Sequence, residues 1–349
     1  MRLERRAHVP VALAVAAPLG AVLVALLVAG GLIALSGASV WAAYQRIVIG
    51  ALGSQLSVTE TLIRTTPLIL TGLAAAVAFR ARVWNIGAEG QFYLGAIVAA
   101  ALGSKAGLHW PSAALIPTLM LAGAVAGAVF LLLPLALRLR FGVDEVVTTL
   151  LLNFVAVLFV SMMIEGPLKD PLAFGWPQSV PVVPDAQLTK LVPRSRLHVG
   201  LLVAIGLAVL VAVVQARTVF GLETRAAGLN PAAARFAGVS LVGVTIAVAC
   251  ISGGLAGLAG AIEVMGVKGY VTKDLSPGYG YTGIVVAMLA NLNPIGVVAS
   301  ALFVAVMFVG SDGMSRALGV PSFIADVIVS LSLLTMLVAL LLVQYRIRR

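Results

Sequence analysis

Polar side chains that could bind a polar solute or an ion interrupt an apolar stretch that reads RARVWNIGAEGQFYLGA. The carboxyl group of Glu89 could exchange a proton or bind a cation, and the amides of Asn85 and Gln91 could hydrogen-bond a polar solute. Ionisable groups inside membrane segments are costly and usually functional, which favours a water-filled route here. The residues leave one alternative open, a helix start at a membrane edge that Asn85 caps and where Glu89 pairs with Arg80 or Arg82.

A further polar side chain lies in an apolar helix that we expect from Asp144 to Ile164. Asn153 within this helix either hydrogen-bonds a neighbouring helix, which is the favoured role, or faces a pathway. The candidate residues for a translocation pathway are therefore Asn85, Glu89, Gln91 and Asn153.

The stretch RTVFGLETRAAGLNPAAARFAGVS, residues 217–240, has the features of a short helix outside the bilayer. Asn230 is a favourable cap, Pro231 suits the first helical position, and Gly238 ends the pattern. A short helix between two apolar runs provides a docking site for a soluble partner, although an ordinary capped loop has the same features. The candidate docking residues are Gly228, Asn230, Pro231, Ala233, Ala234, Arg235 and Gly238.

Several kinds of active site have no candidate in this sequence. No G-x-x-x-x-G-K-[ST] loop is present, so the chain does not bind ATP by that route. His8, His109 and His198 are isolated at predicted helix edges, where surface histidines are common, and Cys250 is the only cysteine. A metal site is therefore disfavoured, and no nucleophile has a base beside it. We expect no cofactor in this chain and no enzymatic activity of its own.

The composition is that of a polytopic membrane protein. Of the 349 residues, 61% are hydrophobic and 10% are charged. At roughly 20 residues per span, the chain has room for about 8 to 10 helices and for no soluble domain. The net charge of +10 comes from basic residues scattered between apolar runs, which favours membrane edges and disfavours a nucleic-acid surface. The predicted fold class is all-α, with about 10 transmembrane helices in one domain, residues 1–349.

Apolar runs predict the spans. Besides a helix that starts near Asn85, these are Val9–Leu35, Thr59–Phe79, Ser112–Leu137, Asp144–Ile164, Leu197–Val214, Val242–Val264 and Pro321–Val343. Tyr281–Leu292 and Ile295–Val309 are too short to cross comfortably, which predicts short or re-entrant helices. The segments expected to be external are Ser36–Val58, the proline-rich residues 165–196, Gly266–Gly280 and Ser311–Val320.

The distribution of arginine predicts the orientation. The segments expected inside the cell hold thirteen of the 23 basic residues, and each of the five inner segments carries arginine. Because positive residues concentrate in cytoplasmic loops, both termini and residues 217–240 are expected in the cytoplasm.

Three motifs add a resemblance to a known family. These are N-I-G-A-E-G-Q at 85–91, G-L-N-P-A-A-A-R-F-A-G-V at 228–239 and S-G-G-L-A-G-L-A-G-A at 252–261, with Asn293-Pro294 before the last spans. In this order they resemble the permease subunits of ABC importers in the simple-sugar and nucleoside branch, and especially the purine nucleoside permeases.

The resemblance implies a type II importer-like permease in a bacterial cell membrane. It also implies partners: ATP-binding subunits that hold ATP and Mg²⁺, a second homologous permease subunit, and an external solute-binding protein. Residues 217–240 would be the cytoplasmic coupling segment that contacts the ATP-binding subunit. The alternatives are a ribose-like sugar or branched-chain amino-acid permease and, in another class, an ion-coupled secondary transporter with Glu89 as its coupling acid.

Overall fold

The computed structural model of the protein describes residues 2–5, 11–105, 107–108 and 110–348, with side chains described between residues 16 and 339. The helices are α1 (Val11–Leu35), α2 (Val40–Leu52), α3 (Gln55–Arg80), α4 (Ala88–Gly103), α5 (Ser112–Phe141), α6 (Glu145–Glu165), α7 (Gly200–Arg217), α8 (Val219–Leu229), α9 (Pro231–Phe236), α10 (Leu241–Glu263), α11 (Tyr279–Leu289), α12 (Pro294–Leu318) and α13 (Ile324–Gln344). A short 3-10 helix η1 (Pro184–Ala186) and a π-helical turn η2 (Val264–Lys268) complete the helical elements. Strands β1 (Arg2–Arg5) and β2 (Tyr345–Arg348) pair antiparallel and join the two ends of the chain.

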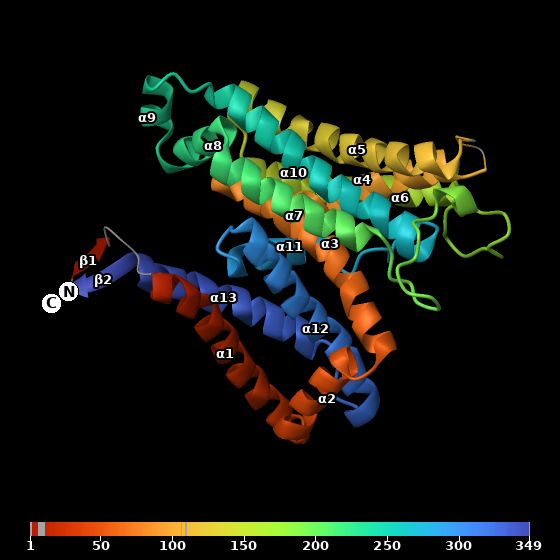
Figure 1. The fold of residues 1–349 in the computed structure, drawn as a ribbon, viewed down its shortest axis with the longest axis horizontal. Helices are drawn as coiled ribbons and strands as arrows, with labels where there is room; N and C mark the ends of the chain where they lie inside the picture. The colour runs from red at the N-terminus through yellow and green to blue at the C-terminus, as the bar shows by residue number, and fades with distance from the viewer. Residues whose placement is uncertain (1, 6–10, 106, 109, 349) are drawn as a thin grey trace.

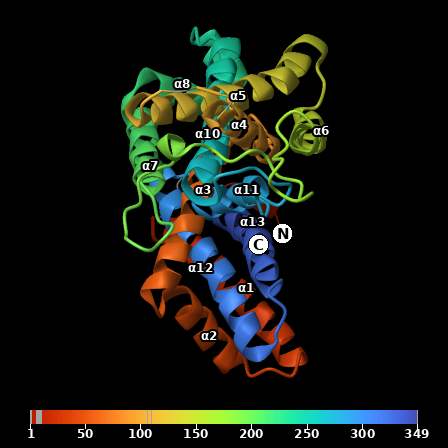
Figure 2. The ribbon, with the colours of Figure 1, turned by 90° about the vertical axis from the view of Figure 1, so that its right-hand side faces the viewer.

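The helices form two groups that meet at α3 (Figures 1 and 2). One group contains α4, α5, α6, α7 and α10, and the other contains α1, α2, α12 and α13, with α11 between them. Helix α3 packs against α7, α10, α11 and α12, and every residue from Thr65 to Phe79 is buried. This helix is therefore the central element on which both groups rest.

The prediction of a polytopic helical protein is confirmed. Within the described residues, seven helices are long and apolar enough to cross a membrane: α1, α3, α5, α6, α7, α10 and α12. Shorter apolar helices are found at Val40–Leu52, Tyr279–Leu289 and Ile324–Ala339. Helix α11, with 11 residues, is about 16 Å long, which is too short to cross an apolar layer of about 30 Å.

Glycine brings α4, α5 and α10 into backbone contact. A Cβ atom on Gly95 would lie 1.9 Å from the carbonyl oxygen of Gly257, and one on Gly127 would lie 2.2 Å from that of Gly253. Any side chain at these positions would force the helices apart. The small-residue faces of α5 and α10 are therefore their packing faces.

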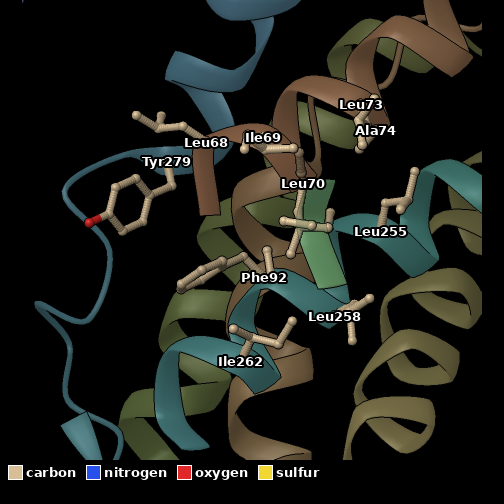
Figure 3. Packing of buried hydrophobic residues seen from close by; sticks show 14 of the residues in the cluster. Leu68, Ile69, Leu70, Leu73, Ala74, Phe92, Leu255, Leu258, Ile262 and Tyr279 are labelled. Carbon is tan, nitrogen blue, oxygen red and sulfur yellow. The ribbon is translucent and has the colours of Figure 1, made fainter. Parts of the chain in front are cut away.

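Large apolar side chains fill the space beside these contacts (Figure 3). Phe92 of α4 lies close to Leu258 and Ile262 of α10, and Leu70 of α3 approaches from the other side. The ring of Tyr279, at the start of α11, lies 5.9 Å from the ring of Phe92 between centroids. The core thus joins α3, α4, α10 and the start of α11.

Helix α12 differs from its prediction. A short helix was expected to end at Val309, but α12 continues to Leu318 through a segment predicted to be external. Asp312 is tolerated in this helix because it pairs with Arg64 of α3 at 2.8 Å. Gly310 allows close packing on α2, since a Cβ atom there would lie 2.3 Å from the carbonyl oxygen of Ile47.

The connection predicted between residues 36 and 58 contains helix α2 and the first turn of α3. Ser39 caps α2, and Ala43, Ile47 and Ala51 follow at helical spacing on its buried face. This face packs against α12. Part of the segment expected to be external is therefore a helix that completes the second group.

The segment after η2, which was predicted to be external, is partly buried. The backbone amides of Ser179 and Val182 donate to the carbonyl groups of Val271 and Gly269 at 2.9 and 2.8 Å, so the proline-rich loop covers it. Leu275 is also buried. The covered segment leads the chain back into the bundle, where α11 begins.

His198, which precedes α7, was predicted to lie at the surface and is instead buried. Its Nδ1 atom accepts a hydrogen bond from the backbone amide of Gly200 at 3.1 Å. Burial lowers the pKa of His198 to about 4. Glycine makes room for the ring, because a Cβ atom on Gly266 would lie 2.4 Å from it.

Candidate transport and docking sites

The amide of Asn85, in the turn between α3 and α4, forms a reciprocal pair with the amide of Gln91, in the first turn of α4. Each side chain donates to the other at 2.9 Å, and Asn85 Oδ1 also accepts from the backbone amide of Gly87 at 2.9 Å. Asn85 Nδ2 donates to Ser252 Oγ at 3.0 Å, and that hydroxyl donates to the carbonyl oxygen of Ala74 at 2.7 Å. Asn85 thus ties α4 to α10 and α3. It is not the N-cap of α4, a role that the sequence had suggested, because this helix begins three residues later.

Asn153 makes the corresponding link from α6. Its Oδ1 atom accepts from the backbone amide of Gly90 at 2.8 Å, and its Nδ2 atom donates to the carbonyl oxygen of Ile86 at 2.9 Å. The same amide group donates to the Tyr281 hydroxyl of α11 at 3.1 Å. Asn153 therefore holds the first turn of α4 and the first turn of α11 together.

The carboxylate of Glu89 binds the start of α11. The backbone amide of Gly280 donates to Glu89 Oε2 at 2.7 Å, and Glu89 is 5% exposed. A carboxylate at a helix N-terminus satisfies an amide that has no partner within the helix and interacts favourably with the helix dipole. The suggested pairing with Arg80 or Arg82 is absent from the ion pairs between side chains 16–339.

The structure thus brings together the four polar residues singled out in the sequence. They surround the facing starts of α4 and α11, and all four are buried. We call Asn85, Glu89, Gln91 and Asn153 the polar junction. A polar junction of this kind binds separate helices tightly while its donors and acceptors are paired, and it can bind solute groups if the helices separate.

Residues 217–240 form the two helices α8 and α9 at one end of the molecule (Figure 1). The Thr218 hydroxyl oxygen accepts from the backbone amide of Gly221 at 3.3 Å, and Asn230 Oδ1 accepts from that of Ala233 at 3.1 Å. Pro231 occupies the first position of α9. The predicted cap and helix start are confirmed, and α8 is an additional helix within the segment.

Comparison with known proteins places this architecture in a family. A family model described as the permease component of a branched-chain amino acid transport system matches residues 57–345, which is most of the chain. The chain belongs to this family of ABC transporter permeases.

Individual relatives in this family carry sugar and nucleoside names. The permease is 37% identical to a glucose ABC transporter permease of Haloferax volcanii, over 99% of this chain and 93% of the relative. It is 34% identical to a guanosine ABC transporter permease of Bacillus subtilis, over 88% and 89% of the two chains. A nucleoside ABC transporter permease of Lactococcus lactis is also 34% identical, over 82% and 80%. The permease is thus the non-catalytic, multi-pass membrane subunit of an ABC transporter.

The α8–α9 segment of the permease exposes four large apolar side chains that are not among the candidate docking residues. Phe236, at the end of α9, is 96% exposed, and Leu229, the last residue of α8, is 62% exposed. Val219 and Leu222 of α8 are also exposed. We call these four side chains the apolar ridge. Apolar residues in a segment outside the spans could have indicated this ridge, but the sequence does not show which of them are exposed.

The candidate docking residues divide into two sets. Gly228 and Ala234 are buried within the permease, whereas Asn230, Pro231, Ala233, Arg235 and Gly238 are exposed. A Cβ atom on Gly228 would lie 2.1 Å from the carbonyl oxygen of Arg80, so α8 rests directly on the last turn of α3. Gly228 therefore supports α8, whereas the five exposed residues lie on the surface of the segment.

Proposed function

We propose that this permease translocates nucleosides as one subunit of an ATP-driven importer, which receives them from an external solute-binding protein. The N-I-G-A-E-G-Q motif supports the nucleoside assignment, as do the guanosine and nucleoside permeases among its relatives. Bacillus subtilis and Lactococcus lactis each contribute a second related permease, 30% and 27% identical to this chain. These pairs support a second, homologous permease subunit and hence a heterodimer.

The α8–α9 segment is the proposed docking site for an ATP-binding subunit, which would hold ATP and Mg²⁺. The observation that carries this proposal is the apolar ridge on a capped helix pair, together with exposed Arg235. An exposed apolar surface rimmed by polar groups is typical of a protein–protein contact. Strands β1 and β2 lie at the same end of the molecule as α9, which supports a cytoplasmic location for both termini (Figure 1). The loop 165–196 would then be external.

The polar junction is the proposed gate of the pathway. Helix α8 touches the carbonyl oxygen of Arg80, and the turn after Arg80 leads to Asn85 and Glu89. A displacement of α8 would therefore act through about five residues on the contact between α4 and α11. Switching between outward and inward access needs such a junction with two arrangements, one paired and one open. Asn85, Glu89, Gln91 and Asn153 would line the opened route.

Glucose or another simple sugar is the second candidate substrate. The observation that favours it is the relative from Haloferax volcanii, a glucose permease, whose similarity covers 99% of this chain. Sugars and the ribose of a nucleoside present hydroxyl groups that carboxylates and amides bind equally well. The polar junction therefore does not separate the two classes by chemistry.

Uptake measurements distinguish the substrates. Cells that lack this gene, with and without the gene restored, are assayed with labelled guanosine, glucose, ribose and leucine. We expect a selective loss of guanosine uptake that returns with the gene. Loss of glucose or ribose uptake with normal guanosine uptake identifies a sugar permease, and loss of leucine uptake identifies an amino-acid permease. In a strain without the ATP-binding subunit, uptake is expected to stop, whereas persistent uptake contradicts the ATP-driven mechanism.

A further inference from the structure

A cavity of about 910 Å³ lies at the α8–α9 end of the permease, between its two groups of helices. Residues of α1 and α12 line one side, the last turn of α7 and the end of α3 line the other, and the α11–α12 turn closes the base. This turn is tight, with positive φ angles of 49° at Asn291 and 59° at Leu292. The cavity is separate from the polar junction, because none of the four junction residues lines it.

Two polar side chains at the edge of the cavity have an unpaired donor or an unbalanced charge. Arg80 donates to Gln215 Oε1, and Gln215 Nε2 is buried with no hydrogen-bond acceptor in the described part of the chain. Among side chains 16–339, no carboxylate forms an ion pair with Arg80, and the positive charge of Arg225 lies near it. A buried donor and an unbalanced guanidinium group in one place favour an anionic acceptor.

Asn291, Asn293 and Ser300 also line the cavity, but most of its wall is apolar and runs along α1 and α12. Pro18, Leu19 and Val22 of α1 face Ala299 and Phe303 of α12 across the cavity. Phe303 lies nine residues after Pro294, which is a depth of about 13 Å at 1.5 Å per residue. One leaflet contributes about 15 Å of the apolar layer of about 30 Å. Leu19 is 66% exposed, so the cavity is open beside α1.

We propose that this cavity binds one anionic phospholipid. The phosphate would accept hydrogen bonds from Arg80 and Gln215 at the membrane edge, and an acyl chain would lie along α1 and α12. Arg80 ends α3 and Gln215 lies in the last turn of α7, which is the level at which headgroups are found. A free phosphate would leave the apolar part of the wall uncovered, and a polyhydroxylated solute would place hydroxyl groups against it. The bound lipid bridges the two groups of helices.

The test uses the purified full-length permease in detergent, with phosphatidylglycerol and phosphatidylcholine of identical acyl chains as probes. Lipid retention is measured by native mass spectrometry and stabilisation by the change in Tm. We expect a clear preference for phosphatidylglycerol. Arg80→Gln should reduce this preference about fivefold, the effect of one basic side chain near an anionic headgroup. Arg80→Lys should keep most of it.

Two further variants control for position and shape. Arg82 is exposed, lies two residues after Arg80 and does not line the cavity. Arg82→Gln should therefore leave the preference for phosphatidylglycerol unchanged. Ala299→Phe should fill the apolar part of the cavity and reduce the retention of both lipids. Equal binding of the two lipids by the wild-type protein overturns the proposal, as does an equal loss in both arginine variants. Stabilisation by inorganic phosphate or by a nucleoside as large as that by phosphatidylglycerol identifies a different occupant and also overturns it.

Discussion

The contact between Gly228 and the end of α3 gives a direct test of the proposed coupling route. In the variant Gly228→Ala, the added methyl group would lie 2.1 Å from the carbonyl oxygen of Arg80. Carbon–oxygen contacts require about 3.3 Å or more. The obstructing atom belongs to the backbone, so no side-chain rotation relieves the clash. Helix α8 must therefore move by about 1 Å.

The free-energy cost of Gly228→Ala decides whether the permease unfolds or only α8 moves. Overpacking of this kind costs about 1–3 kcal/mol. Alanine is favoured over glycine within a helix by about 1 kcal/mol, which offsets part of this cost. The net effect of roughly 0–2 kcal/mol is too small to unfold a protein of this size, so we expect a displaced α8 in a folded permease.

The assay compares ATP hydrolysis with uptake in the reconstituted complex. Gly228→Ala should hydrolyse ATP but import less substrate per ATP, with a wild-type level of permease in the membrane. Gly206→Ala is the matched control on α7, because nothing lies within 4 Å of its added methyl group. This control should couple normally. If Gly228→Ala imports as much substrate per ATP as the control does, the contact with Arg80 does not transmit the movement of α8.

Three further substitutions test separate features. Glu89→Ala leaves the amide of Gly280 without its acceptor and should lower the free energy of unfolding by about 1–3 kcal/mol, measured by thermal unfolding. Glu89→Gln retains an acceptor oxygen and should lose less. An equal loss in the two variants would contradict the capping role. Asn230→Ala removes the cap on Ala233, which should cost α9 about 1 kcal/mol and accelerate its amide exchange, while Asn230→Asp should not. Burial lowers the pKa of His198 to about 4 from about 6.5 in the unfolded chain, so the unfolded state binds more protons as the pH falls. Stability should therefore decrease by about 2 kcal/mol between pH 7 and pH 5, and His198→Gln should reduce this dependence in Tm measurements across that range.

Features that depend on neighbouring residues were predictable from the sequence. Hydropathy over about 20 residues determines which segments can cross the membrane, and seven helices satisfy this condition in the described chain. Asn230 caps α9 through an amide three residues away, so its role follows from local spacing. Three short motifs likewise indicated the family of ABC importer permeases.

Contacts between distant residues could not be predicted in this way. The full length of α12 depends on the pairing of Asp312 with Arg64, which are 248 positions apart. Hydropathy alone treats an unpaired and a paired aspartate identically, so it ended the helix too early. Similarly, His198 is buried because the chain returns with Gly266 against its ring.

The class of protein, most of the spans and the identity of the four polar-junction residues follow from the sequence alone. The tertiary structure decided how those residues act, since the partner of Glu89 is a backbone amide 191 positions away rather than a nearby arginine. It also created the cavity, whose walls come from α1, α3, α7 and α12. A polar group is hydrogen-bonded to water in the unfolded chain and needs a protein partner only once it is buried. Its partner is therefore whichever group the folded chain brings beside it, and local sequence does not reveal that group.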